Sequence, residues 1–367
     1  MGRPRPGRSR FDERGSRTGE ARGIREVSGL AGGPGRRQLG GVFLSIPDSA
    51  QRSGLLFAAL CALNGAFVPG VAKLTTGRAG PLFVATVTTL FAGLAAAVML
   101  GRRGELPRLL ERETAPLLIL LGALGTTIPF VLFFVGTQRT SAIEAVLCLQ
   151  TEPVYSLFMA WLFLGHRLTL RRVGAALVLA AGIVLAVGVG GLSDPLGVAL
   201  LLVTPLSWQI CHLFTLRGLP SVEPYLLTGA RYVYGGALLA LAAWIFGGPD
   251  WMPSGDAFME QLPVLALQGV VLSYVGTMLW YQTIARLDLA RATAIVVPSV
   301  PLLSLGASFL VVGEVPSLSQ GLGMLLTAAG VLAFVTAPHA VEVRERIPAQ
   351  TAPLMAPADP TTGGDQA

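Results

Sequence analysis

The sequence predicts an all-α integral membrane protein whose ten transmembrane helices form two inverted five-helix repeats. Apolar residues make up 52% of the chain and charged residues only 13%, whereas soluble proteins have about 25% charged residues. The mean hydropathy is +0.63. Ten apolar segments each approach the roughly 20 residues that a helix needs to cross a bilayer. The first five span residues 54–72, 81–100, 115–136, 141–165 and 172–189, and the last five span 195–216, 224–247, 263–285, 290–313 and 318–337.

The last five segments repeat the pattern of the first five. A shift of 148 residues places Pro153 on Pro301 and Gly182 on Gly330, and 12 of 46 positions are identical between 142–187 and 290–335. Because each group holds an odd number of spans, the two groups must enter the membrane from opposite sides. Such inverted repeats bind their ligands at the interface between the halves.

The arginines and lysines gather on one predicted side of the membrane. With the N-terminus inside, 23 basic residues lie inside, three lie outside (Lys73, Arg78 and Arg139) and Arg231 lies within a span. Basic loops face the cytoplasm in membrane proteins. We therefore expect a multi-pass protein of the inner (plasma) membrane with both termini cytoplasmic and with residues 249–260 outside.

Four regions follow from this pattern. Residues 1–52 read as a disordered basic cytoplasmic tail, 53–190 as the first repeat, 191–339 as the second repeat and 340–367 as a second disordered tail. The basic tail either contacts anionic lipid headgroups or is simply solvated. The three cysteines, Cys61, Cys148 and Cys211, lie within spans without ligand spacing, so they predict neither disulfides nor a metal site. No cofactor is expected.

The fourth segment of each half carries the most specific motif. In the first half, Glu152-Pro153 is followed by Gly165-His166 and then by Gly174 and Gly182. In the second half, Pro301 is followed by Gly313-Glu314 and then by Gly330. This pattern resembles the EamA-type transporters of the drug/metabolite transporter superfamily. There, the fourth helix of each half contains a proline and closes on Gly-Glu. The resemblance covers about residues 53–337 and implies a carrier of small metabolites.

The sequence departs from that family pattern at three places. His166 replaces the glutamate of the first Gly-Glu, Asn64-Gly65 stands where the family commonly has Trp-Gly, and Thr88 stands where the second half has Arg231. The Glu152-Pro153 pair is similar to amino-acid exporters of the threonine/homoserine type. The substrate therefore stays open between an amino acid and a drug-like compound.

Glu152 is the first candidate for the substrate and proton pathway. It lies near the midplane of its span, where a charge costs about 2.5–3.5 kcal/mol, so an ionisable residue there is a functional candidate by default. Pro153 removes a backbone donor and disturbs the Leu149 carbonyl four residues back. We expect the helix to break here and Glu152 to exchange a proton. The alternative is a protonated carboxyl that satisfies a neighbouring helix.

Other polar or aromatic residues within spans are weaker candidates, since interhelical packing explains each of them as well. We expect Pro298 and Pro301 to break the ninth helix as Pro153 breaks the fourth. Glu144 is expected to be a solvated residue at the mouth, and His212 an interfacial residue. Arg231 either pairs with a carboxylate or a substrate anion, or extends to the cytoplasmic interface. The remaining candidates are Asn64, Gln150, Trp208, Trp280, Tyr281 and Gln282.

The predicted function is secondary active transport of a small metabolite, outward and coupled to protons, by alternating access. The alternatives are an intramembrane enzyme and a passive pore. Gly306-Ala307-Ser308 resembles a rhomboid motif, but the only later histidine, His339, follows the last span. Nothing resembles a selectivity filter or a Walker A loop. The expected partners are a small-molecule substrate and the lipid bilayer, without nucleic acid, and a homodimer is left open.

Overall fold

The computed structural model describes residues 49–164, 168–188, 194–219, 222–248, 251–287 and 289–337. Within these residues the protein is helical without strands, and ten helices are long and apolar enough to cross a membrane. The all-α prediction with ten spans is thus confirmed. Most of the predicted tail 1–52, the tail 340–367 and His166 lie outside the described residues.

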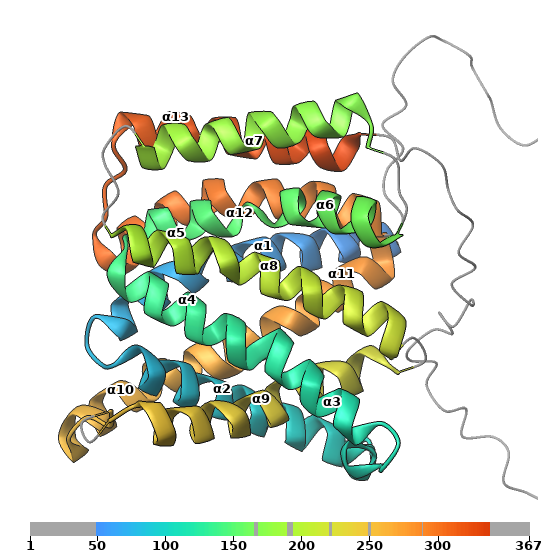
Figure 1. Ribbon diagram of the computed structural model, residues 1–367, viewed down its shortest axis with the longest axis vertical. Coiled ribbons are helices and arrows are strands. Elements are labelled where there is room, and N and C mark those ends of the chain that lie inside the picture. Colours follow the sequence, from blue (N-terminus) through green and yellow to red (C-terminus); the bar gives the residue numbers. More distant parts are fainter. Residues whose placement is uncertain are drawn as a thin grey trace, which may run out of the picture. The chain divides into compact units, whose positions relative to one another are not determined.

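The first five spans are built from seven α-helices and one π-helical segment (Figure 1). Span one is α1 (Ser49–Thr76), and span two is α2 (Pro81–Arg102), followed by the short 3-10 helix η1 (Leu106–Leu110). Span three runs through α3 (Ala115–Gly122), the π-helix η2 (Ala123–Thr127) and α4 (Ile128–Arg139). Span four is divided into α5 (Ala142–Leu149) and α6 (Glu152–Leu164), and span five is α7 (Leu170–Gly188).

The second five spans follow the same order. They begin with α8 (Pro195–Gly218) and α9 (Pro224–Phe246). Span eight runs through α10 (Gly255–Leu267), the π-helix η3 (Gln268–Val275) and α11 (Gly276–Leu287). The last two spans are α12 (Leu289–Val312) and α13 (Leu318–Thr336). Since the spans number ten, α1 begins and α13 ends at the same face of the bundle, which we call the terminal face. The other end is the opposite face.

Two boundaries differ from the sequence prediction. Span eight begins at Gly255, before residue 263, because Phe258 extends the helix by packing on Phe83 of α2 with ring centroids 5.7 Å apart. The ninth helix was predicted to break at Pro298 and Pro301, and that prediction is wrong: α12 is continuous through both prolines. Membrane helices tolerate proline where nearby hydroxyl groups bond to the carbonyls. In α12, Ser299 donates to the Ile295 carbonyl at 2.6 Å, directly beside the Ala294 carbonyl that Pro298 leaves without its helical donor.

Helices of the two halves pack pairwise against each other. α7 lies along α13 and α2 lies along α9 (Figure 1). A Cβ on Gly182 would lie 2.5 Å from the backbone nitrogen of Thr327, and one on Gly330 would lie 2.5 Å from that of Leu179. The 148-residue shift converts one of these contacts into the other, because it places Gly182 on Gly330 and Leu179 on Thr327. The order of the contacts along the two helices also shows that α7 and α13 run antiparallel. Both features follow from halves related by a two-fold axis across the helices. The inverted repeat itself stays a prediction until the halves are superposed.

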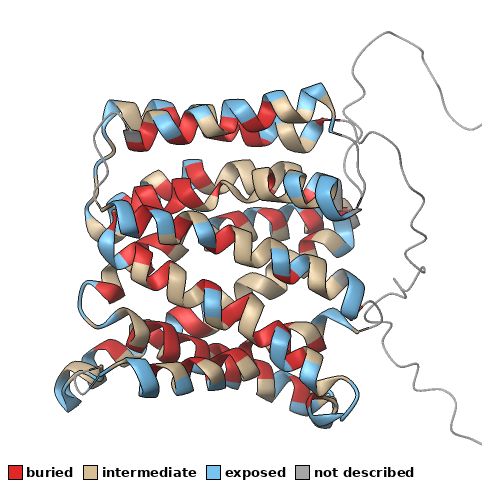
Figure 2. Cartoon of the chain, in the orientation of Figure 1, coloured by how far each residue is buried: buried red, intermediate tan, exposed pale blue. Residues whose placement is uncertain are grey.

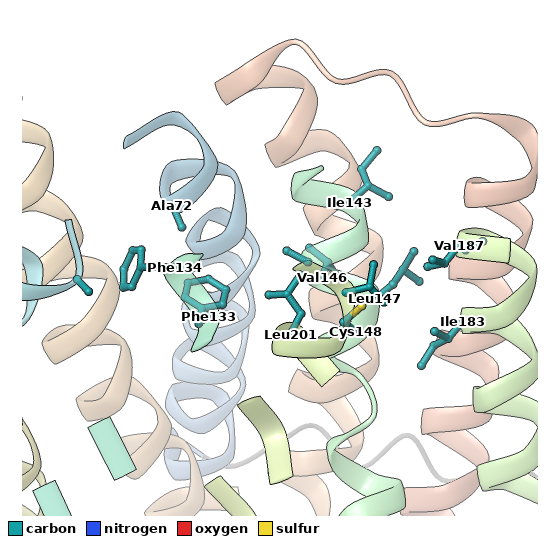
Figure 3. Close-up of a cluster of buried hydrophobic side chains, with 14 of the residues drawn as sticks. Ala72, Phe133, Phe134, Ile143, Val146, Leu147, Cys148, Ile183, Val187 and Leu201 are labelled. Carbon is teal, nitrogen blue, oxygen red and sulfur yellow. The ribbon is translucent and has the colours of Figure 1, made fainter. Parts of the chain in front are cut away.

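The largest core cluster fills the half of the bundle next to the opposite face. Side chains from α1, α4, α5, α7 and α8 meet there (Figure 3), among them Phe133, Leu147, Ile183 and Leu201. All residues from Ala142 to Cys148 of α5 are buried (Figure 2). The bundle is thus closed by apolar packing on the side away from the terminal face.

Candidate functional site

The fourth span is interrupted in its middle. α5 ends at Leu149, and Gln150 and Thr151 form a turn before α6 begins at Glu152. The Thr151 hydroxyl donates to the Cys148 carbonyl at 2.7 Å. Pro153 has no N–H to offer to the Leu149 carbonyl four residues earlier. The break that the Glu152-Pro153 pair predicts is therefore observed, and it leaves backbone polar groups beside a carboxyl group.

A cavity of about 470 Å³ adjoins this break. Its polar lining residues come from both ends of the break and from facing helices; they are Gln150, Glu152, Ser156, Gln209, His212 and Thr293. Its apolar lining residues are Leu149, Pro153, Trp208, Trp280, Val296, Val297, Val300, Phe334 and Val335. Because Phe334 lies in the last turn of α13 and Thr293 in the first turns of α12, the cavity reaches from mid-span toward the terminal face.

Glu152 is half-buried at the edge of this cavity and receives a hydrogen bond from a facing helix. The side-chain amide of Gln209, on α8, donates to Glu152 Oε1 over 2.9 Å. His212 lies one turn further along α8, is exposed and lines the same cavity. Its expected place at the membrane interface stays a prediction. Trp208 was among the predicted candidates, whereas Gln209 was not. The only signal for Gln209 was a polar side chain in an otherwise apolar span.

Arg231 of α9 binds a backbone carbonyl. Its guanidinium donates to the Gly125 oxygen at 2.7 Å, and the ion pairs found among the described residues do not include it. Gly125 permits this approach, since a Cβ there would lie 2.8 Å from Arg231 Nε. The guanidinium is also within electrostatic range of Glu152 and His212. Arg231 therefore contacts the π-helical segment of span three, and it is not among the residues that line the cavity.

The two π-helical segments occupy matching places in the two halves. The 148-residue shift places η2, Ala123–Thr127, on Val271–Val275 of η3. π-Helical turns often mark functional positions, because they rearrange the backbone hydrogen bonds. Each segment accepts a hydrogen bond from the side chain of another span. Arg231 donates to Gly125 in η2, and Asn64 donates to the Val271 carbonyl in η3 at 2.9 Å.

The cavity collects some of the residues that the sequence singled out. Gln150, Glu152, Pro153 and Trp280 line it together. Five others are not among its lining residues, namely Asn64, Arg231, Tyr281, Gln282 and Pro301. The side chain of Gln282 accepts a hydrogen bond from Arg286, and Pro301 is buried within α12. A role in transport stays a prediction for all nine.

Glu144 was predicted to be a solvated residue at the mouth, and this is wrong. Its side chain is only 3% exposed. Its carboxylate accepts from the Ser141 backbone N–H at 3.0 Å, and the Ser141 hydroxyl accepts from the Glu144 N–H at 3.0 Å. This is a capping box, which satisfies two free donors at a helix N-terminus. The Ser-x-x-Glu pattern was present in the sequence as its signal.

The chain matches the EamA-like transporter family over residues 52–188 and 195–336. It is 29% identical over 272 residues to a probable terminal-alkyne amino-acid exporter of Streptantibioticus cattleyicolor, covering 72% of this chain and 83% of the relative. It is 24% identical to the uncharacterised transporter YvbV of Bacillus subtilis, covering 76% of this chain and 90% of the relative. A crystal structure with 22% sequence identity superposes with a TM-score of 0.56, covering 77% of this chain and 96% of that chain, and supports the fold. Ten spans in two sets of five and a family match over both sets lead to one conclusion: this chain belongs to the EamA-like transporter family.

Proposed function

We propose that the protein is a proton-coupled secondary transporter that exports a small amphipathic metabolite through the cavity at Glu152. The observation that carries this proposal is a carboxyl group at a mid-span helix break, facing a cavity between the two halves. Repeat-type transporters bind substrates and coupling ions at such broken helices. The packed opposite face favours a carrier, which opens to one side at a time. A pore would be open at both faces throughout.

The lining of the cavity supports an amino acid with an apolar side chain as the substrate class. Glu152 offers an anionic acceptor for an ammonium group, while Val296, Val297 and Val300 offer an apolar wall for the side chain. The relative from S. cattleyicolor is named as an amino-acid exporter. The excess of basic residues in the loops of the terminal face supports a cytoplasmic position for that face. The cavity would then load from the cytoplasm.

The test is flux in proteoliposomes with and without an imposed pH gradient, across apolar amino acids and the amines that lack their carboxyl group. Glu152→Gln keeps the shape and hydrogen-bonding capacity of the side chain but cannot exchange a proton. We expect net flux driven by the gradient to fall at least about tenfold, which is about 1.4 kcal/mol in barrier terms. Exchange of substrate for substrate should persist, because it need not move a proton.

The matched control is Glu260→Gln, which removes an exposed carboxylate on α10 that does not line the cavity. It should leave net flux unchanged. Wild-type pH dependence in Glu152→Gln would show that the carboxyl group is structural and that coupling lies elsewhere. Release of a chemically altered substrate would favour an enzyme, and flux that does not saturate would favour a pore.

A further inference from the structure

The opposite face is held closed by polar contacts between the ends of different spans. Lys73, in the last turn of α1, donates to the carbonyls of Thr137 and Gln138 at 3.3 and 3.0 Å. Arg139, at the end of α4, forms an ion pair of 2.7 Å with Asp194, which precedes α8. These contacts join neighbouring helix ends, but neither of them touches the broken fourth span.

Glu314 is the contact that reaches the broken span. α12 ends at Val312, and the next residue, Gly313, has a φ of +69° in the left-handed region that glycine adopts without strain. This turn places Glu314 beneath the N-terminus of α5. There, Oε1 accepts from the Ala142 backbone N–H at 3.0 Å, and Oε2 accepts from the Ile143 N–H at 3.2 Å. The carboxylate thus accepts hydrogen bonds from two adjacent backbone N–H groups.

The two hydrogen bonds to Glu314 complete the hydrogen bonding of the first turn of α5. The first backbone N–H groups of a helix have no partner within the helix. In α5, the Ser141 hydroxyl accepts from Glu144, and the Ser141 carbonyl accepts from Ala145 at 3.0 Å. In this turn only Ala142 and Ile143 have their acceptor in a distant part of the chain, the loop between α12 and α13. A negative charge at a helix N-terminus also interacts favourably with the helix dipole.

α5 extends from the hydrogen bonds with Glu314 to the cavity. Its first residue, Ala142, binds Glu314 at the opposite face, and its last residue, Leu149, lines the cavity. Eight residues of helix span about 12 Å. Between the two ends every residue from Ile143 to Cys148 is buried. α5 therefore lies between the cavity and the opposite face and blocks access from that face. The turn at Gln150 and Thr151 separates it from α6.

We propose that Glu314 is a latch that holds α5 in the closed position and that its release from Ala142 and Ile143 opens the opposite face. This inference rests on the proposed function, because only a carrier needs the second opening. The turn before Glu152 supplies the hinge, so α5 moves while α6 keeps its place. The latch joins the second half of the chain to the first, and it thereby couples the movement of α12 to the access of the cavity.

The test uses Cys148 as a reporter, since this native thiol is 0% exposed on α5 behind the latch. Cys61 and Cys211 are replaced by alanine, and a membrane-impermeant thiol reagent is applied to each face separately, in intact cells and in inverted vesicles. Labelling from the opposite face should be slow in this background. Glu314→Gln, which removes the charge and one acceptor, should raise its rate at least about tenfold and leave labelling from the terminal face unchanged.

Ala142→Pro is a second variant that removes a hydrogen bond between α5 and Glu314, independently of any change at Glu314. Proline removes the N–H that donates to Glu314, yet it suits the first position of a helix. The preceding Ser141 already has the extended backbone, with φ of −80° and ψ of 161°, that a residue before proline prefers. This variant should also raise labelling from the opposite face. Glu260→Gln, which removes an exposed carboxylate from α10, should match the background.

Unchanged labelling in both latch variants would overturn the proposal and leave Glu314 as a static helix cap. Equal increases from both faces would also overturn it, because they would indicate general loosening of the bundle. The labelling assay measures access of the reagent to Cys148 and not transport of a substrate. A failure of the transport proposal therefore appears in the flux experiment alone, and a failure of the latch appears in the labelling alone.

Discussion

A close backbone approach between α7 and α13 predicts a sharp difference between two glycines of α7. A Cβ on Gly182 would lie 2.5 Å from the Thr327 backbone nitrogen and 2.7 Å from the Gly323 carbonyl oxygen. Ordinary contacts begin at 3.4 Å, so α7 and α13 must part by roughly an ångström in Gly182→Ala. Overpacking of this kind costs about 1–3 kcal/mol.

Gly174→Ala is the matched control, because a Cβ there meets nothing within 4 Å. Both substitutions gain roughly 1 kcal/mol of helix propensity. Only Gly182→Ala loses packing, so the free energies of unfolding should differ by about 1–3 kcal/mol. A change of 1 kcal/mol shifts the melting temperature by about 2–4 °C in domains of 150–250 residues and by less in longer chains, so the melting temperature of Gly182→Ala should lie a few degrees below that of Gly174→Ala.

The assay is the midpoint of thermal unfolding of the detergent-solubilised protein, measured at one heating rate for all variants. Gly330→Ala should behave like Gly182→Ala, since its Cβ would lie 2.5 Å from the Leu179 backbone nitrogen. Equal melting temperatures for Gly182→Ala and Gly174→Ala would refute the reasoning. Such a result would mean that the two helices are not packed backbone to backbone.

Two further predictions concern the loops. In intact cells, a membrane-impermeant thiol reagent should label a cysteine placed at Ser254 and not one placed at Pro107, both of which are exposed; labelling at Pro107 from outside would reverse the proposed orientation. The hydrogen bond from Arg139, and then those from the backbone, hold the pKa of Asp194 below its ordinary value. A lowered carboxyl pKa adds stability above the pKa of the unfolded chain, and this is lost as the pH falls through the folded value. The melting temperature of Arg139→Gln should therefore lie below that of the wild type at neutral pH and converge with it in acid, and a gap that widens in acid would contradict the ion pair.

The spans could be predicted from the sequence because apolar length is a direct consequence of bilayer thickness. The break at Glu152-Pro153 could be predicted for a similar reason, since proline removes a specific donor. The same rule failed for Pro298 and Pro301, where α12 continues. The outcome there depends on local acceptors and on the packing around the helix, which a residue pattern does not contain.

Other features of the site depend on partners far apart in the chain. Gln209 reaches Glu152 across 57 positions, and Glu314 reaches Ala142 across 172. The π-helical segments insert a residue into a turn without a clear sequence signal, so η2 and η3 were not predicted. Glu144 was assigned by its depth alone, although the capping pattern with Ser141 was visible.

The two halves share their helix pairing and their π-helical segments, yet they differ where a ligand would lie. In the first half the span breaks beside Glu152, and the break removes helical hydrogen bonds within an apolar environment. Such a loss is tolerated where the freed groups face a polar cavity. In the second half α12 continues, and Val300 stands where the first half has Glu152. Among its lining residues the cavity therefore has its carboxyl group on the first half, while the second half contributes the apolar wall of Val296, Val297 and Val300 together with the neutral polar side chains of Gln209 and Thr293 and the imidazole of His212. That asymmetry suits a substrate with a charged group at one end and an apolar body at the other, and it places the proton-exchanging group of our proposal on one half alone.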